Sequence, residues 1–270
     1  MAWTLGTAGS QSATATVSGL TGSPAIYTAT GSAFSLSGLT TGLYDDCALT
    51  SAGGAYCWGG NYTGQLGDGT TTQRATPAQV SGGIVFAGLT AGTQHTCGLT
   101  SGGTAYCWGD NSFGELGDGT TVQRLAPTPV AGGLTFASLV ASANVTCGLT
   151  AAGSAYCWGD NTHGAVGDGT HNQRSTPTAV AGGLTFASLS ARAHTCGLTA
   201  AGAAYCWGMN GEGQLGDGTS NDATSPVAVQ GGLAFASLAV GGLSTCGLTP
   251  AGAAYCWGRN GENELGDGTT

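Results

Sequence analysis

The sequence contains no lysine, and only 7% of its 270 residues are charged. Five arginines face 14 carboxylates, so the formal net charge is −9. Nucleic-acid binding depends on clustered cations that neutralise phosphates. The basic residues are instead dispersed along the chain, at Arg74, Arg124, Arg174, Arg192 and Arg259. The composition therefore predicts no nucleic-acid partner.

Long apolar runs are also absent. No stretch reaches the about 18 apolar residues that a membrane-spanning helix needs, so no membrane insertion is expected. Residues 1–5 lack the basic and apolar regions of a signal peptide. Strong helix formers are scarce beside 52 glycines, which disfavours a helix bundle. Disorder is disfavoured as well, because 41% of the residues are hydrophobic and few are charged.

The ten cysteines reveal the organisation of the chain. They form five pairs that recur every 49 or 50 residues, each pair separated by nine residues. A fixed period near 50 with short β-type segments is typical of a β-propeller or another repeat array. The pairs are Cys47 and Cys57, Cys97 and Cys107, Cys147 and Cys157, Cys196 and Cys206, and Cys246 and Cys256.

The spacing within each pair predicts a β-hairpin. If Cys47 lies opposite Cys57, a three-residue loop remains, and its last residue is Gly53. Three-residue hairpin loops favour a left-handed residue at that place, and glycine occupies it in all five copies. Cysteines that face each other across a hairpin predict five structural disulfides, since zinc and redox sites use closer spacings. Such disulfides predict an oxidising, extracellular or cell-surface location.

Other repeated residues also have structural interpretations. The tryptophan after each second cysteine is expected in core or inter-blade packing rather than in a cofactor site. The aspartate of each Gly-Asp-Gly-Thr is expected to stabilise a tight turn, and Arg74, which follows Asp68 by six residues, to pair with it. Calcium binding is disfavoured because no Asp-x-Asp-x-Asp spacing occurs. We therefore expect no metal and no cofactor.

The repeated text Cys-x-Leu-Thr-x-x-Gly-x-x-Tyr-Cys-Trp-Gly-x-Asn-x-x-Gly-Gln-Leu-Gly-Asp-Gly-Thr, preceded by His95-Thr96 or His194-Thr195, resembles the regulator of chromosome condensation repeat. The resemblance covers about residues 34–270 and implies an all-β propeller of four-stranded blades, typically seven. Five repeats predict a five-bladed ring or arc, or a fragment of a seven-bladed propeller. The cysteine-bearing version is similar to repeats of large secreted bacterial proteins. Members of the family include an exchange factor, a photoreceptor and a β-lactamase inhibitor, and none of their functional residues transfers to this sequence.

Residues 1–33 differ from the repeats. Their alternation resembles the final strands of bacterial immunoglobulin-like domains of adhesins, which implies a piece of a longer surface protein. A second interpretation is that residues 11–19 complete the last blade, because they echo residues 73–82. We thus expect an immunoglobulin-like tail or closing strands at 1–33 and the propeller at 34–270. Open blade edges would allow self-association.

Candidate binding residues lie where the copies differ, because loops on a rigid scaffold commonly carry function. The loop after each Trp-Gly varies, and so does the stretch before each first cysteine. Drift at solvent-facing positions explains the same pattern. The candidate binding residues are Tyr62, Phe113, His163, Glu212 and Arg259.

The function expected from these features is a secreted, non-catalytic binding or adhesion module of a bacterial surface protein. Its ligand would be an extracellular protein or glycan, or a secreted enzyme that it inhibits. The alternative is an extracellular polysaccharide lyase or hydrolase. No catalytic residue is predicted, since the histidines occur in three different copies and paired carboxylates in one. These side chains are His95, His163, His171, His194, Glu262 and Glu264.

Overall fold

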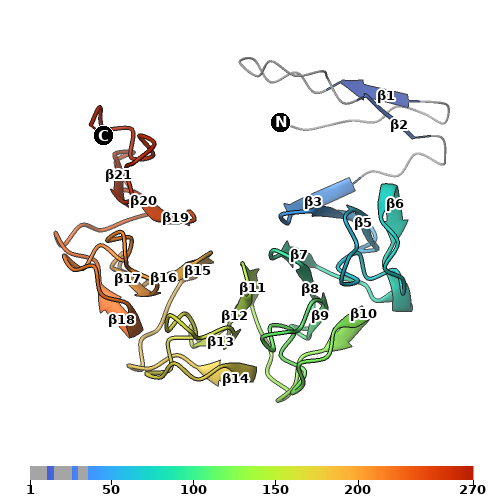
Figure 1. Cartoon of the computed structure of the whole chain (residues 1–270), viewed down its shortest axis with the longest axis horizontal. Helices are drawn as coiled ribbons and strands as arrows, with labels where there is room; N and C mark the ends of the chain where they lie inside the picture. The colour runs from blue at the N-terminus through green and yellow to red at the C-terminus, as the bar shows by residue number, and fades with distance from the viewer. Residues whose placement is uncertain (1–10, 15–25, 30–35, 270) are drawn as a thin grey trace.

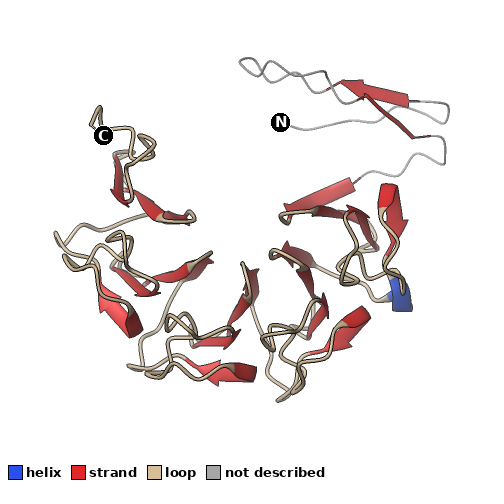
Figure 2. Ribbon diagram, viewed as in Figure 1, coloured by secondary structure: helices blue, strands red, loops and turns tan. Residues whose placement is uncertain are grey.

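The computed structural model describes residues 11–14, 26–29 and 36–269. Repeats of about fifty residues fold into antiparallel sheets that are arranged as five blades in an arc (Figure 1). Figure 2 shows strands joined by loops, with one short 3-10 helix, η1 (Ser81–Gly83). The prediction of an all-β propeller with about fifty residues per blade is confirmed. In the described ranges, no helix is long and apolar enough to cross a membrane.

Within each blade, the strands pair in chain order, from the inner side of the arc outward (Figure 1). The first strands are β3 (Leu36–Thr41), β7 (Gly88–Ala91), β11 (Ser138–Ala141), β15 (Ser188–Ala191) and β19 (Ser237–Val240). The second strands are β4 (Asp45–Thr50), β8 (His95–Leu99), β12 (Val145–Leu149), β16 (His194–Leu198) and β20 (Ser244–Leu248). The third strands are β5 (Ala55–Gly59), β9 (Ala105–Gly109), β13 (Ala155–Gly159), β17 (Ala204–Gly208) and β21 (Ala254–Gly258). The fourth strands are β6 (Arg74–Gln79), β10 (Arg124–Pro129), β14 (Arg174–Ala179) and β18 (Ala223–Ala228).

The last blade has three strands in the part of the chain that the structure describes. The two described N-terminal strands, β1 (Gln11–Thr14) and β2 (Ile26–Ala29), pair with each other in a sheet of their own. Neither strand pairs with β21, so neither takes the closing position suggested by the sequence echo. The rest of residues 1–33 lies outside the described residues, and the domain division at 33 remains an expectation.

The predicted hairpin register is confirmed in every blade. Cys147 lies opposite Cys157, and Gly148 lies opposite Tyr156. Disulfides join the two cysteines of all five pairs. The last glycine of each hairpin loop has a φ between 80° and 85°, a left-handed conformation that side chains with a Cβ disfavour. The cysteine spacing therefore predicted both the pairing and the turn.

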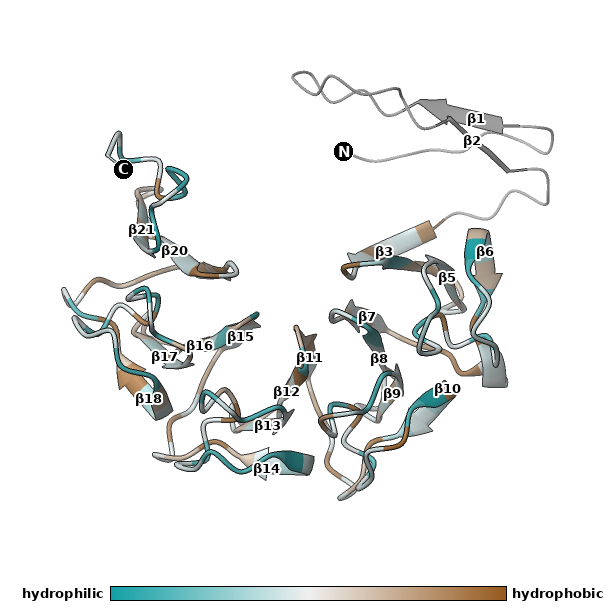
Figure 3. Cartoon of the chain, viewed as in Figure 1, coloured by the Kyte–Doolittle hydropathy of each residue, from teal (hydrophilic) through white to brown (hydrophobic). Residues whose placement is uncertain are grey.

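A small apolar core recurs around the disulfide in each of the first four blades. The sulfurs of the first four blades are fully buried, and Leu66 is buried beside the Cys47–Cys57 pair. Figure 3 shows hydrophobic residues interleaved with hydrophilic ones in blade after blade. Phe86 fills the end of this core and lies so close to Gly98 that a Cβ there would come within 2.5 Å of the ring. The core is thus divided among the blades, and each junction between blades must be stabilised by its own contacts.

Candidate functional site: the blade junctions and the loop face

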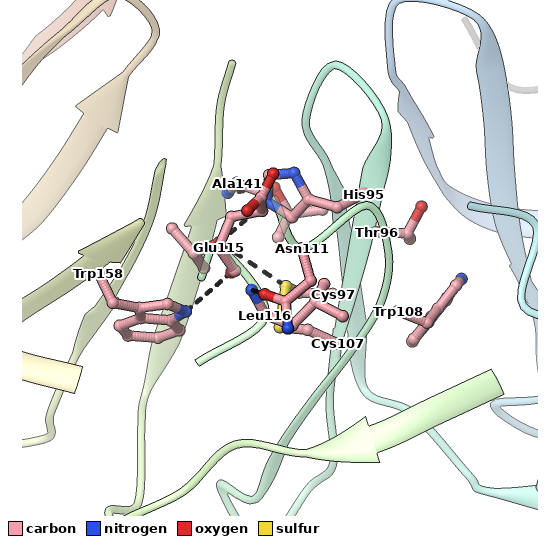
Figure 4. The surroundings of a disulfide bond; sticks show 12 residues. His95, Thr96, Cys97, Cys107, Trp108, Asn111, Glu115, Leu116, Ala141 and Trp158 are labelled. Carbon is pink, nitrogen blue, oxygen red and sulfur yellow. Dashed lines mark hydrogen bonds between the residues drawn. A yellow bond between two sulfur atoms is a disulfide. The ribbon is translucent and has the colours of Figure 1, made fainter. Parts of the chain in front are cut away.

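From the second blade onward, a tryptophan links each blade to the preceding one. The indole of Trp158 is fully buried, and its ring centroid lies 5.9 Å from that of Phe136. Its Nε1–H donates to the backbone carbonyl of Glu115 at 2.9 Å (Figure 4). Gly117, with a φ of 69°, passes so close that a Cβ would lie 2.6 Å from Nε1. The tryptophan was predicted in core or inter-blade packing, and it does pack between blades. The same bond is made by Trp108, Trp207 and Trp257.

A second chain of hydrogen bonds crosses the same junction. The Thr146 hydroxyl donates to the Glu115 carbonyl at 2.8 Å and lies 2.9 Å from His95 Nε2. A hydroxyl has one proton to donate, so His95 donates from Nε2 and its Nδ1 is unprotonated. His194 and Thr245 repeat this arrangement at the last junction. These inter-blade roles were not predicted from the sequence, although the His-Thr pair before the cysteine was noted.

Burial sets the charge of the groups at these junctions. It lowers the pKa of both His95 and His194 to about 4, so the two imidazoles are neutral near pH 7. It raises the pKa of Asp45 and of Glu115 to about 7, against weaker opposing hydrogen bonds. The Glu115 side chain is fully buried, and its Oε1 has no hydrogen-bond partner among the described residues. Glu115 is therefore a buried carboxyl at the junction between the second and third blades, and its ionised form is disfavoured there.

Replacing Glu115 by Gln is expected to stabilise the protein above pH 7. The equivalent residue of the first blade is Gln65, whose Oε1 accepts the Thr63 backbone N–H at 3.0 Å, so the frame accommodates glutamine. The folded-state pKa of Glu115 lies above the ordinary value of 4.5, so its carboxyl favours the folded state at low pH. That contribution is lost as pH rises from about 4.5 to 7. We expect a gain on the order of 2 kcal/mol at pH 8 and almost none at pH 4.

The measurement is the free energy of unfolding by urea denaturation between pH 4 and 8. Glu212→Gln is the matched control, because Glu212 occupies the same kind of loop but is exposed. This control should change stability by less than about 0.5 kcal/mol at every pH. A gain from Glu115→Gln that does not depend on pH would contradict a buried, titrating carboxyl.

The Gly-Asp-Gly-Thr aspartates have the predicted structural role. Asp68 accepts hydrogen bonds from the Thr70 backbone and hydroxyl at 2.9 and 2.7 Å and pairs with Arg74 at 2.7 Å. Burial opposes ionisation, but these partners outweigh it and hold the pKa of Asp68 below its usual range. The pairs Asp118–Arg124 and Asp168–Arg174 repeat the arrangement. Three arginines are thus engaged within their own blades.

Variable segments converge on one face of the arc, which we call the loop face. It comprises the turns after the first strands and the loops after the third strands, which lie at the same end of each blade. In the third blade, for example, the Asp160 N–H donates to the Asn144 carbonyl at 2.9 Å. The turns are 42–44, 92–94, 142–144, 192–193 and 241–243, and the loops are 60–64, 110–114, 160–164, 209–213 and 259–263.

The five candidate binding residues lie in equivalent loops, one on each blade, and do not form a single cluster. Tyr62 is 59% exposed and meets Tyr44 edge-on, with ring centroids 6.2 Å apart. Phe113 is half-buried and Glu212 is exposed. His163 is 2.7 Å from the Asp222 carboxylate, and Arg259 pairs with Glu262 and Glu264 at 3.7 and 3.5 Å.

The histidines considered for catalysis lie in separate surroundings. His95 and His194 are buried at different blade junctions, whereas His163 and His171 are exposed. His171 contacts the backbone carbonyl of Thr162 through Nδ1 at 3.1 Å. Over the described ranges, no three His, Cys, Asp or Glu side chains are grouped so that they could hold a metal ion.

Two cavities open on the loop face. An axial cavity of about 260 Å³ is lined by the inner turns of the first four blades, the strand ends beside them and Val240 at the end of β19. A second cavity, of about 180 Å³, lies between the third and fourth blades and is lined by residues that include Asp160, His163 and Met209. Arg192 and Ala143 line both cavities.

These features define a class of protein: a propeller whose blades share a disulfide-stabilised frame and present different side chains on one face. Family models for the regulator of chromosome condensation (RCC1) repeat match residues 52–99, 102–149, 152–197 and 201–248, and a second such model matches 86–115 and 136–165. The chain belongs to the RCC1 repeat family. A comparison with curated proteins by sequence found no match.

Solved structures of RCC1-type and related propellers resemble the chain. Human WBSCR16 aligns with a TM-score of 0.77 and 20% identity, covering 86% of this chain and 64% of that one. Prp20p of Saccharomyces cerevisiae, described together with its binding properties to Gsp1p and histones, aligns with a TM-score of 0.76 and 22% identity, covering 87% and 61%. The ectodomain of the receptor kinase CR4 of Physcomitrella patens aligns with a TM-score of 0.57 and 28% identity, covering 86% and 54%. The chain therefore spans about three fifths of the first two structures.

Proposed function

We propose that the protein is a non-catalytic binding module that takes an extracellular protein or glycan on its loop face. One observation carries this proposal. The frame of every blade is nearly constant, whereas the exposed loop-face positions carry a tyrosine, a histidine or a carboxylate in different blades. A rigid scaffold that presents varied side chains on one face is suited to recognition.

The five disulfides support an oxidising, extracellular setting for this module. The likeness to the CR4 ectodomain, at 28% identity, supports the same setting. A role in adhesion on a bacterial surface is the most specific form of the proposal, and it rests on the resemblance of the cysteine-bearing repeats to secreted bacterial proteins. Four of the five arginines pair with carboxylates, which supports a ligand other than a polyanion.

A non-catalytic role is supported by the junction histidines. His95 and His194 are enclosed between blades, where each binds a threonine of the next blade. A general acid or base must reach the substrate proton that it transfers, and these buried rings have no such access in the described structure. Protein binding is supported by the description of Prp20p, a structural relative, with Gsp1p and histones.

The proposal is tested by screening the immobilised protein against glycan and extracellular-protein arrays. Hits are then measured with a loop-face variant that carries Tyr62→Ala, Phe113→Ala, and Glu212→Ala. We expect at least about a tenfold loss of affinity, because exposed aromatic anchors commonly dominate binding. The midpoint of thermal unfolding should fall only modestly, since Tyr62 and Glu212 are exposed and Phe113 is half-buried.

The matched control changes the opposite end of the same blades. Ser51→Ala, Ser101→Ala and Ala200→Ser alter exposed positions in the hairpin turns between the second and third strands. This control should bind within about twofold of wild type. Equal loss in both variants, or no loss in either, would place the binding surface away from the loop face.

A further inference from the structure

One inner turn on the loop face differs from the others. In the first three blades and the last one, three residues separate the first strand from the second, whereas in the fourth blade only Arg192 and Ala193 do so. The backbone N–H of Arg192 bonds to the His194 carbonyl at 2.8 Å. The equivalent positions are Gly42, Gly92, Ser142 and Gly241, which make the corresponding bond in their own turns. Arginine therefore replaces a very small residue on the axial side of the fourth blade.

The Arg192 backbone is held in place on both sides. Its carbonyl oxygen accepts a hydrogen bond from the Ser142 hydroxyl of the preceding blade at 2.7 Å. Its N–H donates to the His194 carbonyl, as described above. These two bonds fix the backbone from which the Arg192 side chain lines the axial cavity.

Arg192 is also the one arginine without a carboxylate. Within the described residues, its guanidinium makes no ion pair and no side-chain hydrogen bond, whereas the other four arginines pair with Asp or Glu. It is exposed and lines both cavities of the loop face. The chain has a net charge of −9. Arg192 is nevertheless an unpaired cation, and it lies where the two cavities meet.

We propose that Arg192 binds a single carboxylate, the side chain of a Glu or Asp on a protein partner, in the axial cavity. This inference deepens the proposed function and rests on the same loop face. A planar guanidinium can donate two parallel hydrogen bonds to a carboxylate. No other charged residue lines the axial cavity, so nothing in its lining competes for Arg192.

The remaining walls favour an acidic amino-acid side chain over an acidic sugar. Ala91, Ala141, Ala191 and Val240 line the cavity beside Arg192. These walls suit the methylene stem of glutamate. The hydroxyls of Thr41, Thr93 and Ser142 also line the cavity, and that of Ser142 already donates to the Arg192 carbonyl. Among the lining side chains, two threonines therefore remain for the several hydroxyl groups of a uronic acid, and burying hydroxyls without partners is unfavourable. Asp160 in the neighbouring cavity repels a second carboxylate. The cavity therefore selects one isolated carboxylate rather than a run of them.

The arginine side-chain spectrum provides a direct test. The chain has five arginines and no lysine, so a ¹⁵N-labelled sample gives at most five Nε–Hε signals, and four of them come from paired arginines. The probe is doubly blocked N-acetylglutamate amide, with N-acetylglutamine amide as its neutral counterpart. We expect the Arg192 signal to shift and saturate with the glutamate probe alone, while the other four change little.

Two variants separate a built site from an exposed cation. Arg192→Gln should weaken glutamate binding at least about tenfold, followed on the backbone amides of the turn. Ala143→Phe keeps Arg192 but places a ring where both cavities meet, and should weaken binding at least about fivefold. The backbone spectrum of each variant shows whether the fold is retained.

Three results would overturn the inference. These are no saturable shift of Arg192, equal shifts for both probes, and unchanged binding in Ala143→Phe. If glucuronate binds as tightly as the glutamate probe, the ligand would be an acidic glycan rather than a carboxylate of a protein partner. Because the probes are small molecules, the test does not depend on the array screen. Failure of this site and failure of the loop-face proposal can therefore be distinguished.

Discussion

Reduction of the five disulfides is expected to unfold the protein. Each disulfide joins cysteines ten residues apart, and closing so short a loop contributes about 2–3 kcal/mol in the chain-entropy model. Five such contributions reach about 10–15 kcal/mol, as much as the whole stability of an ordinary domain, about 5–15 kcal/mol. The apolar clusters around the disulfides are small, so the blades have little other core to retain them.

The order in which the disulfides react is also predictable. The sulfurs of the first four blades are fully buried, whereas Cys246 and Cys256 of the last blade are partly exposed. Mild reductant under native conditions should therefore open the Cys246–Cys256 bond first, which alkylation and peptide mass mapping would detect. After full reduction in denaturant and removal of the denaturant, circular dichroism should show no cooperative thermal transition. A reduced chain that regains a wild-type transition would remove the main support for an oxidising location.

Features that depend on residues close together in the sequence could be predicted from the sequence alone. The cysteine spacing and the loop glycine determine the hairpin, so the Cys147–Cys157 register follows without knowledge of any other blade. The Asp68–Arg74 pair spans six residues and was predicted for the same reason. The fold class followed from the repeat period. These features rest on steric and hydrogen-bonding rules that operate within a single blade.

Features that depend on how the blades are placed could not be predicted. His95 and Thr146 are 51 residues apart, and Thr146 and Glu115 are 31 apart, so their contact requires the separation and rotation between blades. The burial that shifts the pKa values of His95 and Glu115 has the same origin. The cavity at Arg192 was missed too, although the single 49-residue interval between Cys147 and Cys196 was a visible signal of a shortened turn. Most of residues 11–19, which were suggested as a closing strand, lies outside the described residues; the described part, β1, pairs with β2.

Truncation of Trp158 is expected to uncouple the second and third blades. Trp158→Ala removes a fully buried indole, its contact with Phe136 and its hydrogen bond to the Glu115 carbonyl. Replacing a buried tryptophan by alanine typically costs about 3–5 kcal/mol. Trp58→Ala is the matched control, because Trp58 holds the same place in the first blade but is partly exposed, and within the described residues its indole makes no hydrogen bond. The control should lose much less, about 1–2 kcal/mol.

Which blades lose protection in Trp158→Ala is more informative than the total loss of stability. In a repeat array each blade is stabilised mainly by its neighbours, so the loss of one junction should divide the arc into two units that open separately. Hydrogen exchange should show reduced protection in the second and third blades, next to the junction, and less change in the last blade. Trp158→Phe, which keeps a ring but no N–H donor, should lose less than Trp158→Ala, since Thr146 still donates to the Glu115 carbonyl. Uniform loss of protection over all blades would mean that the arc unfolds as one cooperative unit, and that the junctions transmit stability well beyond adjacent blades.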